Sequence, residues 1–176
     1  MRKLKYIFPV LISVLFICGC YESEVPLSEP SLKVDPRLIK NWTSLPKNKN
    51  EKSILLLFRK FNENEYLVAW KEGDDKTLIT RGFVTRIDNT NIINVHNIDS
   101  LDKKERAYVF FRYAFNEKGN LVSAILSDDY PLLKGKEFKS SKNFNNFVHK
   151  NISQNGLFDE SIEFKVIENI NFEINP

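Results

Sequence analysis

Thiols and imidazoles, the side chains that most often carry nucleophilic or metal chemistry, are scarce in this chain of 176 residues. It contains two cysteines, Cys18 and Cys20, and two histidines, His96 and His149. Neither histidine stands four residues from another, the spacing that places two imidazoles on one helix face, and neither lies near a cysteine in the sequence. We therefore expect structural or surface histidines, no metal site and no cofactor.

Carboxylates occur as two adjacent pairs, Asp74-Asp75 and Asp128-Asp129. Neighbours on a strand point to opposite faces, so neither pair forms a ready acid–base dyad, and aspartate favours turns. No Gly-x-Ser-x-Gly elbow, phosphate loop or dinucleotide fingerprint is present, and the six glycines do not cluster. The residues therefore favour a protein that is not an enzyme. A catalytic site without a recognisable motif is the less favoured alternative.

The N-terminus has the layout of an export signal. Arg2, Lys3 and Lys5 precede an apolar run over residues 6–17. A helix needs roughly 20 apolar residues to cross a bilayer, so this run favours a cleaved signal peptide over residues 1–19. An ordinary secretory signal or an uncleaved apolar N-terminus is the alternative.

The apolar run ends in Ile17-Cys18-Gly19-Cys20, which resembles the lipobox of bacterial lipoproteins. The resemblance implies cleavage before Cys20 and attachment of diacylglycerol to its thiol. The membrane then becomes a partner through two or three acyl chains, enough for stable anchoring in the cell envelope. Tyr21 stands where an aspartate would resemble an inner-membrane retention signal, which favours the outer membrane if the host has two membranes.

Charge and composition divide the residues after the signal into a tether and a domain. The signal holds three of the 26 basic residues and none of the 23 acidic ones, so residues 20–176 are formally neutral. A neutral domain has no global attraction to nucleic acid, and we expect none as a partner. Residues 20–34, with Pro26 and Pro30 among serines and glutamates, predict an acylated N-terminus and a flexible, solvated tether. Residues 35–176 are expected to form a single β-rich domain.

Most of that domain shows strand signals. Runs of apolar and branched residues separated by short polar turns are expected to form strands over residues 53–61, 65–71, 76–87, 91–98, 107–116 and 121–127. The period then changes: Phe144, Phe147, Val148 and Ile152 form one stripe of an amphipathic helix, with Ser141 as its N-cap. Residues 161–167 alternate again. The predicted fold is mainly β (α+β): an antiparallel meander or barrel, one helix and a last strand.

This order of elements is similar to a lipocalin-like (calycin) barrel. Asp35-Pro36-Arg37-Leu38-Ile39-Lys40-Asn41-Trp42 resembles the lipocalin entry motif, in which a short helical turn leads to Gly-x-Trp and the Trp closes one barrel end. Here Lys40 replaces the Gly, and Lys165 is the candidate for the basic residue that covers the Trp from the last strand. The alternatives are that Trp42 is an ordinary core aromatic, and that the fold is a half-open barrel or a sheet packed on the helix.

Aromatic strands without a catalytic motif favour a binding or structural accessory domain that holds a small apolar ligand. The residues expected to form its pocket or core are Trp42, Trp70, Phe83, Phe111 and Tyr113. An envelope protein–protein interaction module is the alternative. A basic cluster flanks the start of the helix and either contacts anionic headgroups or is a solvated loop; it comprises Lys134, Lys136, Lys139 and Lys142.

Overall fold

The structure is a computed structural model that describes residues 20–46, 51–98 and 107–168. The predicted signal peptide, including Ile17, Cys18 and Gly19, lies outside the described residues. The described strands are β1 (Asn41–Ser44), β2 (Ile54–Lys60), β3 (Glu65–Glu72), β4 (Leu78–Ile87), β5 (Thr90–Asn97), β6 (Tyr108–Phe115), β7 (Leu121–Ile125) and β8 (Ile162–Val166). The helix α1 (Ser141–Asn151) lies between β7 and β8 in the sequence.

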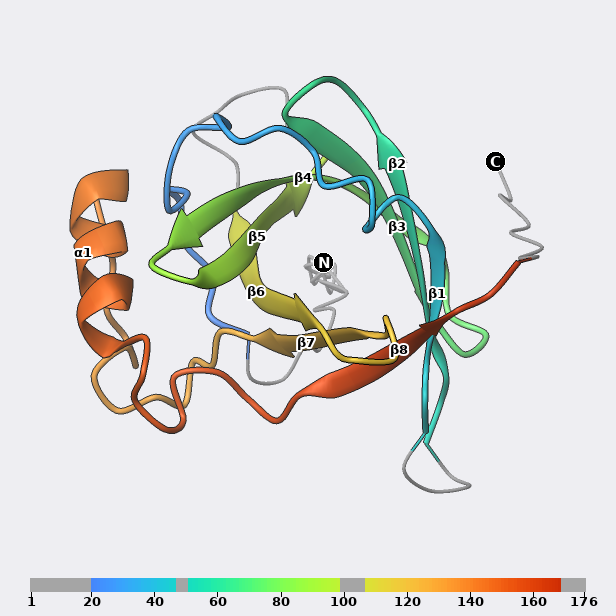
Figure 1. Cartoon of the computed structure of the whole chain (residues 1–176). Coiled ribbons are helices and arrows are strands. Elements are labelled where there is room, and N and C mark those ends of the chain that lie inside the picture. The colour runs from blue at the N-terminus through green and yellow to red at the C-terminus, as the bar shows by residue number, and fades with distance from the viewer. Residues whose placement is uncertain (1–19, 47–50, 99–106, 169–176) are drawn as a thin grey trace, which may run out of the picture.

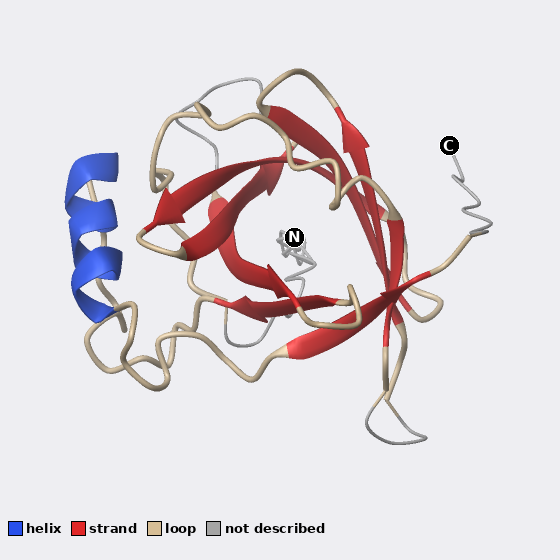
Figure 2. Ribbon diagram, in the orientation of Figure 1, coloured by secondary structure: helices blue, strands red, loops and turns tan. Residues whose placement is uncertain are grey.

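The eight strands form one closed barrel (Figures 1 and 2). Each strand pairs antiparallel with the next along the chain, and β8 returns to pair with both β7 and β1, so that Trp42 lies opposite Val166. The predicted fold class is confirmed: a mainly β meander with one helix followed by a last strand. The half-open alternative is wrong, because the β1–β8 pairing leaves no open edge in the barrel.

Asparagine side chains build two of the hairpin turns at one barrel end. In the β2–β3 turn, the Oδ1 atom of Asn62 accepts hydrogen bonds from the backbone N–H groups of Asn64 and Glu65, each at 2.9 Å. In the β6–β7 turn, Asn116 Oδ1 does the same for Lys118 and Asn120 at 3.0 Å. Such local bonds satisfy the backbone where the ladder ends, which explains why these short polar sequences reverse the chain.

The helix lies outside the barrel beside β4 and β5 (Figure 1). Its apolar residues Phe144 and Val148 are fully buried in a core that includes Phe110 of β6. Both faces of β6 are therefore covered, one by the barrel interior and one by α1, which explains its nearly continuous apolar sequence. The N-cap is Ser140, whose hydroxyl accepts from the N–H of Asn143 at 3.3 Å, one residue before the predicted cap.

Phe83 is buried, but on the outer face of β4. It is 3 % exposed and belongs to the core between barrel and helix. Phe83 is therefore a core residue, as the prediction of pocket or core residues allows, but it belongs to the core outside the barrel and does not line the barrel interior. On β4 the neighbouring Thr80 and Val84 face inward, so strand alternation turns Phe83 outward. Seven of the ten residues of β4 are apolar or branched and they stand on both faces, so its pattern alone does not reveal which face is inside.

The predicted tether is also wrong, because residues 20–34 pack against the barrel. Tyr21 is 6 % exposed and Leu27 is 2 % exposed. The backbone N–H of Tyr21 donates to the Leu126 carbonyl at 3.0 Å, and Ser23 exchanges two backbone hydrogen bonds with Tyr108. The Ser, Glu and Pro composition predicted solvation, but a few apolar residues fill the space between the outer face of the barrel and α1.

Candidate functional site: an apolar cavity inside the barrel

One end of the barrel, where the odd-numbered strands begin, is closed by Trp42. Its side chain is fully buried, and its Nε1–H donates to the carbonyl of Leu38 at 3.0 Å. Leu38 is itself fully buried in the short turn that precedes β1. The ring of Phe115 lies 6.0 Å from that of Trp42. Trp42 therefore occupies the place that the lipocalin-like entry motif implies.

The cations near this aromatic pair come from the entry turn. The Arg37 guanidinium lies 4.6 Å from the centre of the Phe115 ring, and the Lys40 ammonium lies 5.9 Å from that of Trp42. Lys165 on β8 is exposed. The prediction that Lys165 covers the Trp is therefore replaced by two cation–π contacts from the N-terminal side.

A buried tyrosine joins the turn to the barrel wall. The hydroxyl of Tyr66, which is fully buried, accepts a hydrogen bond from the backbone N–H of Asp35. Burial raises the pKa of Tyr66 to about 12. Burial acts to raise the pKa of Asp35 as well. The Arg37 guanidinium, 2.7 Å away, has the opposite effect: its hydrogen bonds and positive charge lower the pKa of Asp35 below the usual value. Both groups therefore hold the closed end together in their ordinary charge states at neutral pH.

A cavity of about 300 Å³ fills the barrel from its middle to the other end. Its walls are almost entirely aliphatic and aromatic, and the rings of Trp70 and Phe111 lie 5.9 Å apart there. Tyr113 also lines it, and burial raises the pKa of its phenol. Among the described lining residues, the charged ones are Asp159 and Glu160, in the segment leading into β8.

Exposure of the inward-facing side chains shows which end is open. Trp42 and Tyr66 are fully buried at the closed end. At the opposite end, Ile54, Trp70 and Val109 point inward but are only half-buried. The mouth of the cavity is therefore the end at which the even-numbered strands begin.

Three of the predicted pocket residues, Trp70, Phe111 and Tyr113, line the cavity. Trp42 forms its closed end, and Phe83 lies outside. Sequence reasoning missed aliphatic wall residues such as Leu56 and Leu78, and the acids at the mouth. The alternation of β8 predicted the inward face of Ile162, but no local signal marked Asp159 as a rim residue.

The chemistry available in this cavity is burial of apolar surface. Ligand sites are typically about 300–1,000 Å³, so this one suits a small apolar molecule or part of one acyl chain. Removing apolar area from water contributes about 25 cal/mol per Å². The polar lining residue Thr80 donates to the carbonyl of Val68 at 3.1 Å and is already satisfied.

Cys20 lies at the same end as the mouth. It pairs with Ser127, just beyond β7. Burial, followed by the charges of Glu22, Asp159 and Asp128, raises the pKa of its thiol to about 12. The thiolate is the reactive form of cysteine, so an unmodified Cys20 in the folded chain is a poor nucleophile.

Both histidines have ordinary surroundings. His96 is buried on the outer barrel face, with its ring 5.2 Å from that of Tyr108. His149 is exposed on α1, and its Nε2 atom lies 3.2 Å from an Asp88 carboxylate oxygen. Within residues 20–46, 51–98 and 107–168, no three His, Cys, Asp or Glu side chains form a group suited to a metal ion. In the same part of the chain, no helix has the length and hydropathy to cross a membrane.

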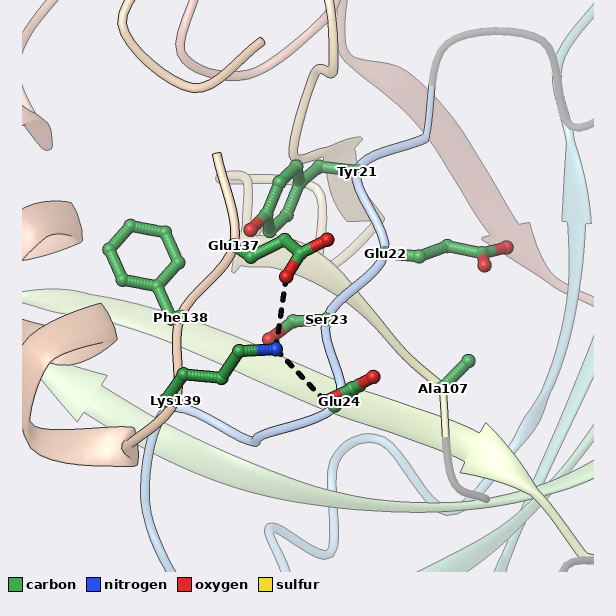
Figure 3. A pocket seen from close by; sticks show the side chains of 8 residues that line it. All are labelled: Tyr21, Glu22, Ser23, Glu24, Ala107, Glu137, Phe138 and Lys139. Carbon is green, nitrogen blue, oxygen red and sulfur yellow. Dashed lines mark hydrogen bonds and ion pairs between the residues drawn. The ribbon is translucent and has the colours of Figure 1, made fainter. Parts of the chain in front are cut away.

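A second hollow, of about 240 Å³, lies on the outside between residues 21–24 and the segment before α1 (Figure 3). The Lys139 ammonium lies 2.9 Å from a Glu137 carboxylate oxygen and 3.6 Å from one of Glu24. Tyr21 and Glu22 point to opposite sides of their segment (Figure 3). This hollow is lined by both charged and aromatic side chains, and its ion pairs join the N-terminal segment to the segment before α1.

Fold and cavity together define the class of protein: a closed, lipocalin-like antiparallel β-barrel with an apolar interior that is compatible with ligand binding. Comparison of the chain with protein-family models, curated proteins and solved structures yields no match.

Proposed function

We propose that this chain is an envelope lipoprotein, attached to a membrane through acyl chains on Cys20, whose barrel binds a small apolar ligand. The observation that carries the binding proposal is the cavity, which is apolar, closed by Trp42 at one end and open at the other. The anchor proposal rests on the N-terminal charge, the short apolar run and the residues Ile17-Cys18-Gly19-Cys20.

Energetics favour a chain-like ligand. Each buried methylene contributes about 0.8 kcal/mol, so burying eight would contribute roughly 6 kcal/mol before the entropic cost of association. The cavity is too small for a large lipid to enter completely. We therefore infer a ligand with a single medium-length acyl or alkyl chain.

A cavity-filling substitution tests the binding proposal. Val109 is half-buried and lines the cavity from β6, so Val109→Phe should occupy ligand space with little strain on the barrel. Ala114→Phe on the same strand is the matched control, because Ala114 is exposed. The measurement is native mass spectrometry of the full processed chain, released from detergent micelles after incubation with a medium-chain monoacylglycerol.

We expect a non-covalent adduct with the unsubstituted chain and with Ala114→Phe, and at least a tenfold loss of adduct with Val109→Phe. The same spectra, recorded under denaturing conditions, report the mass of the covalent lipid on Cys20. Equal adduct formation by all three chains, or none by any, refutes binding in the cavity.

A further inference from the structure

The register of the barrel places the Cys20 side chain on the cavity side of its segment. Ser123 and Ile125 of β7 line the cavity, and Ser127 follows with the same alternation. Cys20 lies opposite Ser127 in an antiparallel bridge, and residues directly opposite each other share a face. The sulfur of Cys20 therefore points to the same side of the sheet as the Ile125 side chain. It lies one residue pair further toward the mouth, at the rim of the cavity.

Asp159 supports this placement independently. It lines the cavity, and its backbone N–H donates to the carbonyl of Ile125 at 2.9 Å. Its carboxylate is also close enough to Cys20 to raise the pKa of the thiol. Asp159 therefore connects the cavity wall with the end of β7, beyond which Cys20 pairs with Ser127.

No free residue separates Cys20 from the part of the chain that is bonded to the barrel. The next residue, Tyr21, is bonded through its backbone to Leu126 and through its hydroxyl to the carbonyl of Lys136 at 2.6 Å. Further along, the N–H of Leu27 donates to Asn94 Oδ1 at 2.8 Å, and its carbonyl accepts from Asn145 at 3.1 Å. A lipid on Cys20 would therefore hold the barrel within about one residue of the bilayer surface.

The loop between β7 and α1, residues 128–139, adds a surface suited to headgroups at the same end. Leu132 is 59 % exposed in it, and the Lys134 and Lys139 side chains are more than two-thirds exposed. The exposed Leu132, two residues before Lys134, can enter the interface. The two lysines lie 3.9 Å from Asp129 and 2.9 Å from Glu137, and their exposed ammonium groups can also meet headgroup phosphates. The Tyr21 and Lys139 contacts fix this loop to the segment that carries Cys20 (Figure 3).

We propose that the open end of the barrel faces the membrane, so that the cavity takes up its ligand directly from the lipid leaflet in which Cys20 is anchored. The partner of this surface, made of the rim and residues 128–139, is a phospholipid bilayer. This orientation rests on the proposed lipid anchor and deepens the proposed binding function.

Site-specific fluorescence tests the orientation. The processed chain retains no cysteine besides Cys20, whose sulfur would carry the lipid, so one added cysteine can be labelled selectively. Leu132→Cys places the label in the loop beside the mouth. Glu117→Cys places it on the exposed tip of the β6–β7 turn, at the closed end. Both full processed chains are reconstituted in phosphatidylcholine vesicles that contain a spin-labelled lipid quencher.

We expect severalfold stronger quenching at position 132 than at position 117. Equal quenching, or stronger quenching at position 117, overturns the proposed orientation.

A flexible spacer tests the functional consequence. About ten Gly and Ser residues inserted between Cys20 and Tyr21 add roughly 15–20 Å of reach without altering the barrel. We expect this spacer to weaken quenching at position 132 and to slow at least threefold the transfer of a fluorescent monoacylglycerol from vesicles. The same spacer inserted between Lys118 and Gly119 is the control and should change neither.

Mass spectrometry of each chain separates the possible failures. A chain without covalent lipid refutes the anchor, and the orientation with it. A second outcome is a lipidated chain that forms the monoacylglycerol adduct but transfers the ligand at the same rate with and without the spacer. This outcome overturns direct uptake from the leaflet but is consistent with the proposed binding function.

Discussion

Trp42 and Trp70 both point into the barrel, but they serve opposite ends of it. Trp42 is fully buried and hydrogen-bonded to Leu38, whereas Trp70 is half-buried at the mouth beside Phe111. A fully buried side chain that closes a core contributes more to folding than one that borders an existing cavity. The two tryptophans therefore allow stability and binding to be tested separately.

Trp42→Ala should lower the free energy of unfolding by about 3–5 kcal/mol, because it leaves a void at the closed end of the barrel. Urea denaturation followed by circular dichroism measures the change. Trp70→Ala is the comparison and should cost less. If Trp42→Ala leaves the midpoint unchanged, Trp42 does not close the barrel.

Tyr66 should make the fold sensitive to alkali. Its pKa in the folded chain is about 12, above the ordinary value of about 10, so the folded state retains a proton that the unfolded state has lost. Stability should therefore be complete below pH 10 and fall by about 1–3 kcal/mol as the pH rises from 10 to 12. Tyr66→Phe should lower stability at pH 8, by losing the bond to Asp35, but flatten this decline. An unchanged slope contradicts the assignment.

At the scale of elements, residues 20–34 behave as part of the barrel and not as a tether. They contribute Tyr21 and Leu27 to the core beneath α1, and their backbone is paired with Tyr108 and Leu126. Asn94 makes a buried polar contact with this segment: it is fully buried, accepts from the Leu27 N–H, and donates to Thr85 at 2.9 Å. Buried polar groups of this kind are costly to leave unpaired.

Asn94→Ala should lower the free energy of unfolding by about 1–3 kcal/mol and speed hydrogen exchange at the Leu27 amide. Hydrogen exchange with mass spectrometry resolves the effect by segment. Asn97→Ala, at an exposed position on the same strand, is the control. Equal protection of residues 21–28 in all chains would show that Asn94 does not hold this segment.

At the scale of the whole molecule, the barrel combines a closed end, an open cavity and a proposed attachment point beside the mouth. Cys20→Ala should abolish incorporation of a palmitate analogue and leave a precursor that retains residues 1–19, because the thiol is the proposed acceptor of the lipid. Metabolic labelling and intact mass measure both effects. Ser23→Ala is the nearby control, and labelling that survives Cys20→Ala would refute the anchor.

Local sequence predicted most of the elements and part of the candidate site. The runs over residues 65–71, 107–116 and 161–167 match β3, β6 and β8, and Trp70, Phe111 and Tyr113 line the cavity as expected. These predictions succeed because strand alternation and helix period follow from backbone geometry within one segment. The sequence did not reveal which face of β4 carries Phe83, because apolar and branched residues stand on both faces of that strand.

The sequence by itself thus determined the order of seven of the eight strands and of the helix, the turns and the aromatic wall of the barrel. The tertiary structure alone decided that β1 closes against β8, that residues 20–34 are packed, and that the cavity opens beside Cys20. Each of these depends on contacts between segments far apart in the chain, such as Trp42 with Val166 and Cys20 with Ser127. No periodicity within a single segment encodes which distant segment will cover it.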